Sequence, residues 1–398
     1  MIMVEFSKRV PADGTDAVGV ILNSASDPNV ISFAGGLPAG ELFPVKEMEK
    51  ATDEAYEKHG EAAMQYGSAS GVEELRKQLL RRSEEKENIK ANLENIMMTT
   101  GSEQALDLVG KTFIDPGDAV LLEEPTYLCA VDVFRSYGAK FVGVEMDDNG
   151  MRTDKLEEAL KTHPEAKLIY TIPNYQNPSG RTMSLERRKK VAELAAKYNV
   201  YVLEDNPYGD IRFEGEKHIT SIKSFDTTDH VIYTSTFSKI LAPGFRLGWV
   251  IANDYLIKKL TVMKQSADLQ TDNLVQYACS AFLKNNDIDE HIKVISKAYG
   301  ERKDRMVEDI KKYFPKNVKC TNPKGGMFLW VTVPGVEDTV ELFKKCLKHN
   351  VAFVPGDPFF GTNPVPGTFR LNYSCMSDDK IDEGIKRLGN ALKEAIEE

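Results

Sequence analysis

The chain has 398 residues, of which 41% are hydrophobic and 28% are charged, and its formal net charge is -10. This composition is typical of a globular protein that is long enough for two domains. The acidic balance argues against nucleic acid or an anionic membrane as the main partner, because the basic stretches alternate with acids on predicted helices.

The N-terminal residues carry no recognisable targeting signal. They include Glu5, Lys8 and Arg9, and no stretch of the chain approaches the ~20 apolar residues of a membrane helix. The five cysteines are scattered and never in C-x-x-C spacing, and the six histidines form no metal-binding motif. We therefore expect a cytoplasmic protein with reduced thiols and no metal site.

The first part of the chain is predicted to mix helices with glycine-rich segments. We expect a helix over 12–25, an extended segment over 29–44 that ends in a Gly/Pro-rich turn, and helices over 46–59 and 72–85. The last two helices are joined by the small-residue loop 64–71.

From residue 96 the chain alternates predicted strands and helices. The apolar strands are predicted over 96–100, 119–123, 140–144, 167–171, 200–203, 231–235 and 248–252. Amphipathic helices lie between most of them, for example over 154–163 and 184–198, with Asp154 and Ser184 as expected N-caps. The pattern predicts an α/β fold in which a mainly parallel sheet of about seven strands is covered on both faces. Such sheets bind ligands at the carboxyl ends of their strands.

The C-terminal part is predicted to form a smaller α+β unit. Helices run to about residue 285, and a long charged helix over 287–314 leads to strands over 326–333, 351–354 and 368–373 and to helices over 340–349 and 378–397. We expect a large domain over 45–285 and a small domain made of 1–44 and 286–398.

The stretch 231–249 is the most informative part of the chain. A buried strand is followed by the hydroxyl residues Thr236 and Ser238, then by Lys239, and after a Pro-Gly break by Arg246. Burial lowers the pKa of a lysine, and a neutral amine can form a Schiff base with an aldehyde. Hydroxyls and an arginine suit a phosphate monoester, so this stretch indicates pyridoxal phosphate, PLP. The alternative is a solvated loop lysine.

Two other strand ends could contribute to the same site. Gly101, Ser102 and Glu103 open a helix whose free N–H groups would bind a phosphate, although Gly-Ser there is also typical of a plain helix cap. We expect the Glu103 side chain to point away, leaving only its amide for the phosphate. Tyr127, after the next strand, would lie on a cofactor ring or simply pack in the core.

Two further strand ends carry polar side chains. Asn177, in a rigid Pro/Asn/Gly turn, would bond a phenolate oxygen or a substrate carboxylate, or else only stabilise the turn. Asp205 ends a very apolar strand, where an acid should be paired. Beside a pyridine nitrogen it would keep that nitrogen protonated, and Tyr208 on the same turn would bond the ring oxygen. The turns of 124–125 and 177–178 are each expected to hold a cis proline.

These motifs resemble those of the PLP-dependent aminotransferases of fold type I, class I/II. The segment S-T-F-S-K-I-L-A-P-G-F-R-L-G-W is similar to the Schiff-base segment of the family, and N-P-S-G, D-N-P-Y, G-S-E-Q and E-P-T-Y are similar to its other cofactor motifs. F-A-G-G-L-P and M-Q-Y-G-S-A-S-G resemble the subgroup of 2-aminoadipate, kynurenine and broad aromatic or branched-chain aminotransferases.

The resemblance implies a role for each site residue. Lys239 would carry PLP as an aldimine and then act as the general base, Asp205 would pair with the pyridinium, and Tyr127 would stack on the ring. Tyr208 and Asn177 would bond the ring oxygen. The phosphate would be held by Ser102, the Glu103 amide, Thr236, Ser238 and Arg246. The family often carries a neutral residue at position 103 and Ser at 236, so Glu103 and Thr236 are departures.

The resemblance also implies a substrate site and a homodimer. Arg370 would grip the α-carboxylate of the substrate, with Gly36 nearby, and Tyr66 would reach the phosphate in the neighbouring subunit. From the residues alone, Arg370 would be an ordinary strand arginine. The small domain is expected to close over bound substrate.

The resulting hypothesis is an aminotransferase that moves the amino group of an L-amino acid to a 2-oxo acid, with 2-oxoglutarate as the expected acceptor. The donor would be of the aromatic, 2-aminoadipate or branched-chain type, and the sequence does not choose among these. A PLP-dependent C–S β-lyase or decarboxylase is the first alternative, because the Schiff base is common to all three. A PLP-binding regulatory protein is a remote alternative, since such proteins carry an N-terminal DNA-binding domain and this acidic chain starts its aminotransferase-like part almost at Met1.

Overall fold

The computed structural model describes residues 6–10, 19, 27–215 and 219–397. The helix predicted over 12–25 lies outside the described residues except for Gly19. Among the described residues, no helix combines the length and the apolar character that crossing a bilayer requires.

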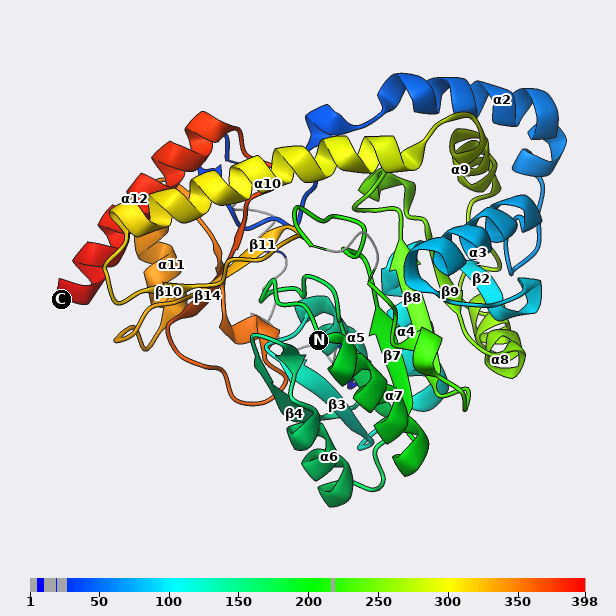
Figure 1. Cartoon of the computed structure of the whole chain (residues 1–398), viewed down its shortest axis with the longest axis horizontal. Coiled ribbons are helices and arrows are strands. Elements are labelled where there is room, and N and C mark those ends of the chain that lie inside the picture. The colour runs from blue at the N-terminus through cyan, green and yellow to red at the C-terminus, as the bar shows by residue number, and fades with distance from the viewer. Residues whose placement is uncertain (1–5, 11–18, 20–26, 216–218, 398) are drawn as a thin grey trace, which may run out of the picture.

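A sheet of eight strands forms the centre of the larger part of the molecule (Figure 1). The five strands β3, β4, β6, β7 and β8 run parallel to one another, and β2, β5 and β9 are antiparallel to their neighbours. The order is β2 (Ile96–Thr99), β9 (Gly248–Ile251), β8 (Val231–Thr236), β7 (Tyr201–Asp205), β6 (Leu168–Thr171), β3 (Ala119–Glu124), β4 (Lys140–Asp147) and β5 (Gly150–Met151). The predicted mainly parallel sheet is confirmed, and β5 is a two-residue addition to it.

Both faces of this sheet are covered because its strands are apolar at successive positions. Leu121 and Ile169 pack with α6 (Thr153–Thr162) and α7 (Leu185–Tyr198) on one face. Their neighbours Leu122 and Tyr170 point to the opposite face, where α4 (Gly101–Phe113) and α5 (Leu128–Ser136) lie. The sheet therefore has a dry core on each side.

One of the two predicted helix caps is correct. The Ser184 hydroxyl accepts a hydrogen bond from the Arg187 N–H at the start of α7, as predicted. Asp154 is not an N-cap, because α6 already begins at Thr153, and its carboxylate instead pairs with Arg152 at 2.6 Å.

A second group of helices flanks the β2 and β9 edge. It consists of α2 (Val45–Met64), α3 (Glu73–Glu87), α8 (Asp254–Gln265) and α9 (Asn273–Asn285). The predicted end of α2 at residue 59 is wrong, because the chain kinks at His59 and continues as a helix. The His59 ring stacks on Tyr277 of α9 with 4.3 Å between ring centroids, which anchors the kink.

The 26-residue helix α10 (Ile288–Tyr313) crosses from these helices to the smaller sheet, where α12 (Asp378–Glu397) packs along it (Figure 1). Asp287 caps its start by accepting from the N–H groups of Asp289 and Glu290. The smaller sheet is antiparallel, in the order β10 (Lys319–Cys320), β11 (Phe328–Thr332), β14 (Thr368–Asn372) and β13 (Val354–Pro355), and α11 (Thr339–Lys348) lies beside it.

The segment before α2 reaches this smaller part of the molecule. Its strand β1 (Ile31–Ser32) pairs in parallel with β12 (Val351–Ala352). The strand predicted over 351–354 is therefore split, because β12 pairs with β1 and β13 pairs with β14.

Candidate active site

A cavity of about 220 Å³ lies at the carboxyl ends of the parallel strands, next to the smaller sheet. It brings together every predicted site residue except Tyr66, from segments far apart in the sequence. Its lining includes Gly36, Ser102, Glu103, Tyr127, Asn177, Asp205, Tyr208, Thr236, Ser238, Lys239, Arg246 and Arg370. Tyr66 follows α2, is 79% exposed and does not line this cavity.

A larger cavity of about 870 Å³ lies elsewhere, between the loop 180–182 and the segment 319–324, which includes β10. Among the described residues that line it, the lysines are Lys319 and Lys324, which are exposed, and these residues offer no hydroxyl cluster or buried acid comparable to that of the smaller cavity. The smaller cavity is therefore the candidate active site.

The hydroxyls and the arginine meet in one corner of the cavity. The oxygens of Thr236 and Ser238 lie 2.9 Å apart, and the Arg246 guanidinium is 3.4 Å from Ser238 Oγ. Gly101 has φ +76 and a Cβ there would be 2.4 Å from Arg246, so glycine lets the guanidinium lie against the start of α4. Likewise, a Cβ at Gly248 would be 2.9 Å from the Ser102 nitrogen. A phosphate would meet a helix N-terminus, two hydroxyls and one cation here.

Asp205 is 2% exposed at the last position of β7, where burial raises its pKa to about 7. Its Oδ2 accepts a hydrogen bond from the Tyr170 hydroxyl at 2.9 Å, whereas its Oδ1 is buried and has no partner within the described part of the chain. A buried carboxylate oxygen without a donor is costly unless a ligand supplies one. Tyr170 was not predicted, although its place on β6 beside Asp205 follows from the strand alternation.

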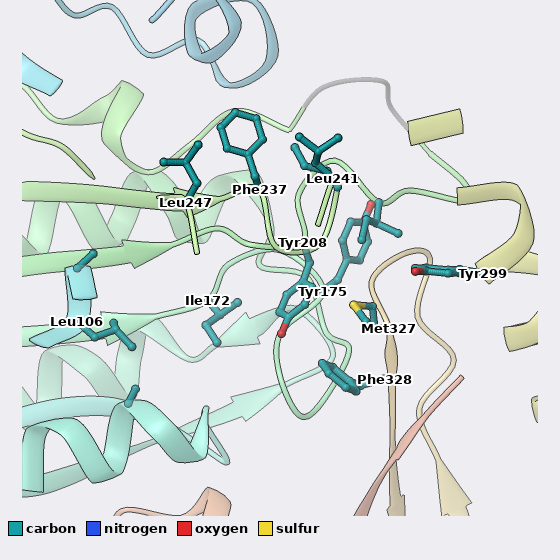
Figure 2. Close-up of a cluster of buried hydrophobic side chains, with 14 of the residues drawn as sticks. Leu106, Ile172, Tyr175, Tyr208, Phe237, Leu241, Leu247, Tyr299, Met327 and Phe328 are labelled. Atoms are coloured by element: carbon teal, nitrogen blue, oxygen red, sulfur yellow. The ribbon is translucent and has the colours of Figure 1, made fainter. Parts of the chain in front are cut away.

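Asn177 links the two groups predicted for the ring oxygen and the substrate. Its Nδ2 donates to the Tyr208 hydroxyl at 3.5 Å, and its Oδ1 accepts from Arg370 Nη1 at 2.8 Å. Figure 2 shows Tyr208 beside Phe328 of β11, and their rings meet edge to face at 5.7 Å. The turns of Glu124-Pro125 and Asn177-Pro178 both hold cis prolines, as predicted.

Arg370 projects from β14 and is 4% exposed. Its guanidinium lies over the Phe328 ring at 4.2 Å and the Phe359 ring at 5.1 Å, and its Nη2 donates to the Ala34 carbonyl at 2.7 Å. Its buried Nε has no partner among the described residues. Burial lowers the pKa of Arg370 to about 10, so the side chain is still a cation at neutral pH.

Lys239 is partly buried, and its Nζ donates to the Gly36 carbonyl at 2.9 Å. Burial, followed by the positive charges of Arg370 and Arg246, lowers the pKa of this amine to about 8. A sizeable fraction of the amine is therefore uncharged near pH 8, which is the form that attacks a carbonyl.

The Glu103 side chain does not point away from the cavity as expected. It lines the cavity and accepts a hydrogen bond from the Tyr127 hydroxyl at 3.4 Å. The expectation failed because Tyr127 supplies a donor and Arg246 supplies a compensating charge. Burial raises the pKa of Glu103, and both neighbours oppose this rise.

Three independent observations indicate that the residues of this cavity fit PLP. The unpaired Asp205 Oδ1 suits a ring N–H, the glycine-lined corner suits the phosphate, and Lys239 supplies an amine of lowered pKa. Among the described residues, no group of three or more histidine, cysteine, aspartate or glutamate side chains is arranged to hold a metal ion.

Comparison with known proteins agrees with this geometry. The sequence model of the family described as "Aminotransferase class I and II" matches residues 28–388. Aromatic-amino-acid aminotransferase 1 of Thermococcus litoralis is 43% identical over 395 residues, which cover 98% of this chain and 94% of that protein. The 2-aminoadipate transaminase of Thermus thermophilus is 38% identical over 378 residues, which cover 94% of this chain and 92% of that protein.

The fold also agrees with that of a solved aminotransferase. The crystal structure of Pyrococcus horikoshii kynurenine aminotransferase in complex with PMP superposes with a TM-score of 0.94 at 39% identity and covers 98% of this chain and 97% of that one. The chain therefore belongs to the class I and II aminotransferases. The predictions of a PLP-dependent aminotransferase and of an α/β fold of type I are confirmed.

Proposed function

We propose that this aminotransferase moves the amino group of an L-amino acid to a 2-oxo acid, with 2-oxoglutarate as the acceptor and with PLP bound covalently through Lys239. One observation carries the proposal: a lysine of lowered pKa, a buried acid with a free oxygen and a buried arginine meet in one cavity. These are the groups that amino-group transfer requires.

The residues of the cavity would have separate roles. Bound PLP would supply an electron sink for the electron pair left at the substrate Cα. Asp205 would hold the proton of the ring nitrogen, and Tyr208 and Asn177 would donate to the ring oxygen. Lys239 Nζ would take the proton from the substrate Cα and deliver it to the carbon of the cofactor that came from its aldehyde, which leaves the substrate as a 2-oxo acid after hydrolysis.

Arg370 is suited to the α-carboxylate of the substrate. Its Nε is unpaired and each Nη carries a second N–H, so a two-pronged pair with a carboxylate is available. Phe328 and Phe359 keep water from the guanidinium faces, which strengthens the pair. Because Asn177 bonds both Arg370 and Tyr208, the carboxylate and the cofactor oxygen are held in a fixed relation.

The walls of the cavity favour an apolar or aromatic substrate side chain. Leu37, Leu128 and Ile172 supply apolar surface. The cations in the described lining are Lys239, Arg246 and Arg370, and each has a role already. The apolar walls support aromatic or branched-chain donors, whereas the second carboxylate of 2-oxoglutarate would have to be held by groups other than these three cations of the described lining.

The proposal includes a homodimer, two domains and a cytoplasmic location. The 79% exposure of Tyr66 suits a residue that reaches the phosphate of a neighbouring subunit. The domain limits proposed are those expected from the sequence, 45–285 against 1–44 with 286–398, and the pairing of β1 with β12 supports them. The free state of all five cysteines supports the cytoplasmic location.

The deciding experiment combines cofactor labelling with a substrate panel. Wild type with PLP is reduced with borohydride and digested, and the label should sit on Lys239. Lys239→Ala should lose both the label and transamination, whereas Lys258→Ala, at an exposed lysine, should keep both. The panel tests aromatic, branched-chain and 2-aminoadipate donors with 2-oxoglutarate.

Two outcomes would contradict the proposal. A label on another lysine, or none, would remove the assigned cofactor site. Steady release of ammonia without any 2-oxo acid acceptor would instead identify a lyase or another PLP reaction.

A further inference from the structure

Tyr170 is a buried hydroxyl residue that the proposed chemistry does not yet use. It lies on β6, is fully buried, and donates its hydroxyl proton to Asp205 Oδ2 at 2.9 Å. It does not line the cavity, so its effect on a bound molecule must pass through Asp205.

The strand register explains why the two side chains meet. Tyr170 is paired with Leu203 across β6 and β7, and Asp205 follows Leu203 by two positions. Side chains two apart on a strand share a face, so Tyr170 and Asp205 lie on the same side of the sheet, one step apart. The phenol is long enough to span that step.

The Tyr170 ring has little freedom to turn away. Phe134 of α5 packs against it edge to face, with 5.7 Å between centroids and an interplanar angle of 74°. Both rings are fully buried. The hydroxyl is thus aimed at one carboxylate oxygen, and the carboxylate is oriented with the other oxygen free.

We propose that Tyr170 is a positioning residue of the cofactor site: it fixes the Asp205 carboxylate so that Oδ1 faces the ring nitrogen of PLP, and it favours the ionised form of that carboxylate. This inference rests on the proposed use of PLP. A hydroxyl that donates to a carboxylate stabilises the anion, and the remaining oxygen then accepts from a cation without having to reorient.

The charged and titratable groups around Asp205 agree with this role. Burial is the main factor that raises the pKa of Asp205, Glu103 on α4 raises it further, and the Tyr170 hydrogen bond lowers it. Tyr208, on the turn that follows β7, interacts with the same carboxylate. Tyr170 is the group in this set that opposes protonation of Asp205.

The test is the PLP dissociation constant of Tyr170→Phe as a function of pH. Phenylalanine keeps the packing on Phe134 and removes only the donor. We expect PLP to bind about tenfold more weakly than in wild type at pH 7. The pH below which affinity falls should move upward by about one unit, because Asp205 then protonates more easily. Tyr170→Leu, which also lacks the donor, should show the same upward shift of the pH profile.

The matched control is Tyr373→Phe. Tyr373 is also fully buried, and its hydroxyl donates to the Gly325 carbonyl at 2.9 Å, away from Asp205. It should lose a similar amount of thermal stability and bind PLP as wild type does. A double-mutant cycle with Asp205→Ala separates positioning from packing, since the effect of Tyr170→Phe should vanish when the carboxylate is absent.

The outcomes separate this inference from the proposed function. Equal affinity and equal pH profile in wild type and Tyr170→Phe would overturn the role of Tyr170 alone. An undiminished effect of Tyr170→Phe in the Asp205→Ala background would also overturn it. A wild type that does not bind PLP would overturn both.

Discussion

Glu103 places a carboxylate in a cavity that otherwise suits a phosphate dianion. Its side chain is held by the Tyr127 hydroxyl, and the Arg246 charge partly compensates it. At the same time, Glu103 raises the pKa of Asp205. One side chain therefore acts on both ends of the proposed cofactor site, and in both places its charge is unfavourable to bound PLP.

We predict that Glu103→Gln tightens PLP binding about threefold or more, because glutamine keeps a partner for Tyr127 and removes the repulsion of a nearby anion. The measurement is a fluorescence titration of the cofactor-free protein with PLP. Glu186→Gln, at an exposed position in the first turn of α7, should leave the affinity unchanged. Weaker binding by Glu103→Gln would mean that the carboxylate itself helps to hold the cofactor.

For single residues, the sequence predicted which side chains line the candidate site, but it did not predict the direction of every side chain. Lys239 and Asp205 could be predicted because a charged residue at the end of an apolar strand needs a reason to be there. Arg370 could be placed only through the resemblance, since a strand arginine carries no signal of its own. The direction of the Glu103 side chain depends on Tyr127 and Arg246, which are distant in sequence, and no local pattern contains that information.

At the scale of elements, Glu123 ties two neighbouring strand ends together. This residue of β3 is 1% exposed and accepts hydrogen bonds from Thr171 Oγ1 at 2.7 Å, from the Ile172 N–H at 3.1 Å and from Gln176 Nε2 at 3.3 Å. It therefore anchors the turn that carries Asn177. Burial raises the pKa of Glu123 to about 7.

We predict that Glu123→Gln removes part of the pH dependence of stability. The folded pKa lies above the ordinary value of about 4.5, so this group stabilises the fold at low pH and loses that contribution as the pH rises through about 7. From pH 5 to pH 8, wild type should lose about 2 kcal/mol of unfolding free energy relative to the variant. Denaturant unfolding at both pH values measures this.

Glu145→Gln, at an exposed residue of β4, is the control for this experiment and should follow wild type at both pH values. A Glu123→Gln variant that keeps the full wild-type slope would show that the Glu123 carboxyl stays ionised in the folded protein.

The elements themselves were largely predictable, because long apolar strands and amphipathic helices carry strong local patterns. The failures have tertiary causes. The two-residue strand β5 is too short for a pattern, and α2 runs past Gly60 because His59 stacks on α9. The segment 351–354 forms two strands because two different partners pair with it.

At the scale of the whole molecule, Tyr66 is the predicted site residue that does not line the cavity. Its exposure and its place after α2 suit contact with a second copy of the chain. If each site needs Tyr66 from its partner, then two different defective chains can restore one another.

We predict that mixing Lys239→Ala with Tyr66→Phe chains yields heterodimers with one complete site. In such a dimer the site with the native Lys239 receives Tyr66 from the Lys239→Ala subunit. The variants are unfolded, mixed and refolded, and tight PLP binding should return in up to about a quarter of all sites, as random pairing requires. Refolded Tyr66→Phe alone is the control and should bind PLP weakly. No gain on mixing would place Tyr66 outside the shared site.

The helix α10 links α3, on the side of the larger sheet, to α12, on the side of the smaller sheet. Near one end Asp289 pairs with Arg82 of α3 at 2.7 Å, and farther along Arg305 pairs with Asp382 of α12 at 2.9 Å. A helix of this length spans about 39 Å, so tilting it by about 5° at the α3 end would shift the far end by about 3 Å. Because α12 packs along the far part of α10, a slight rotation at the α3 end would move α12 by several times the displacement at the pivot.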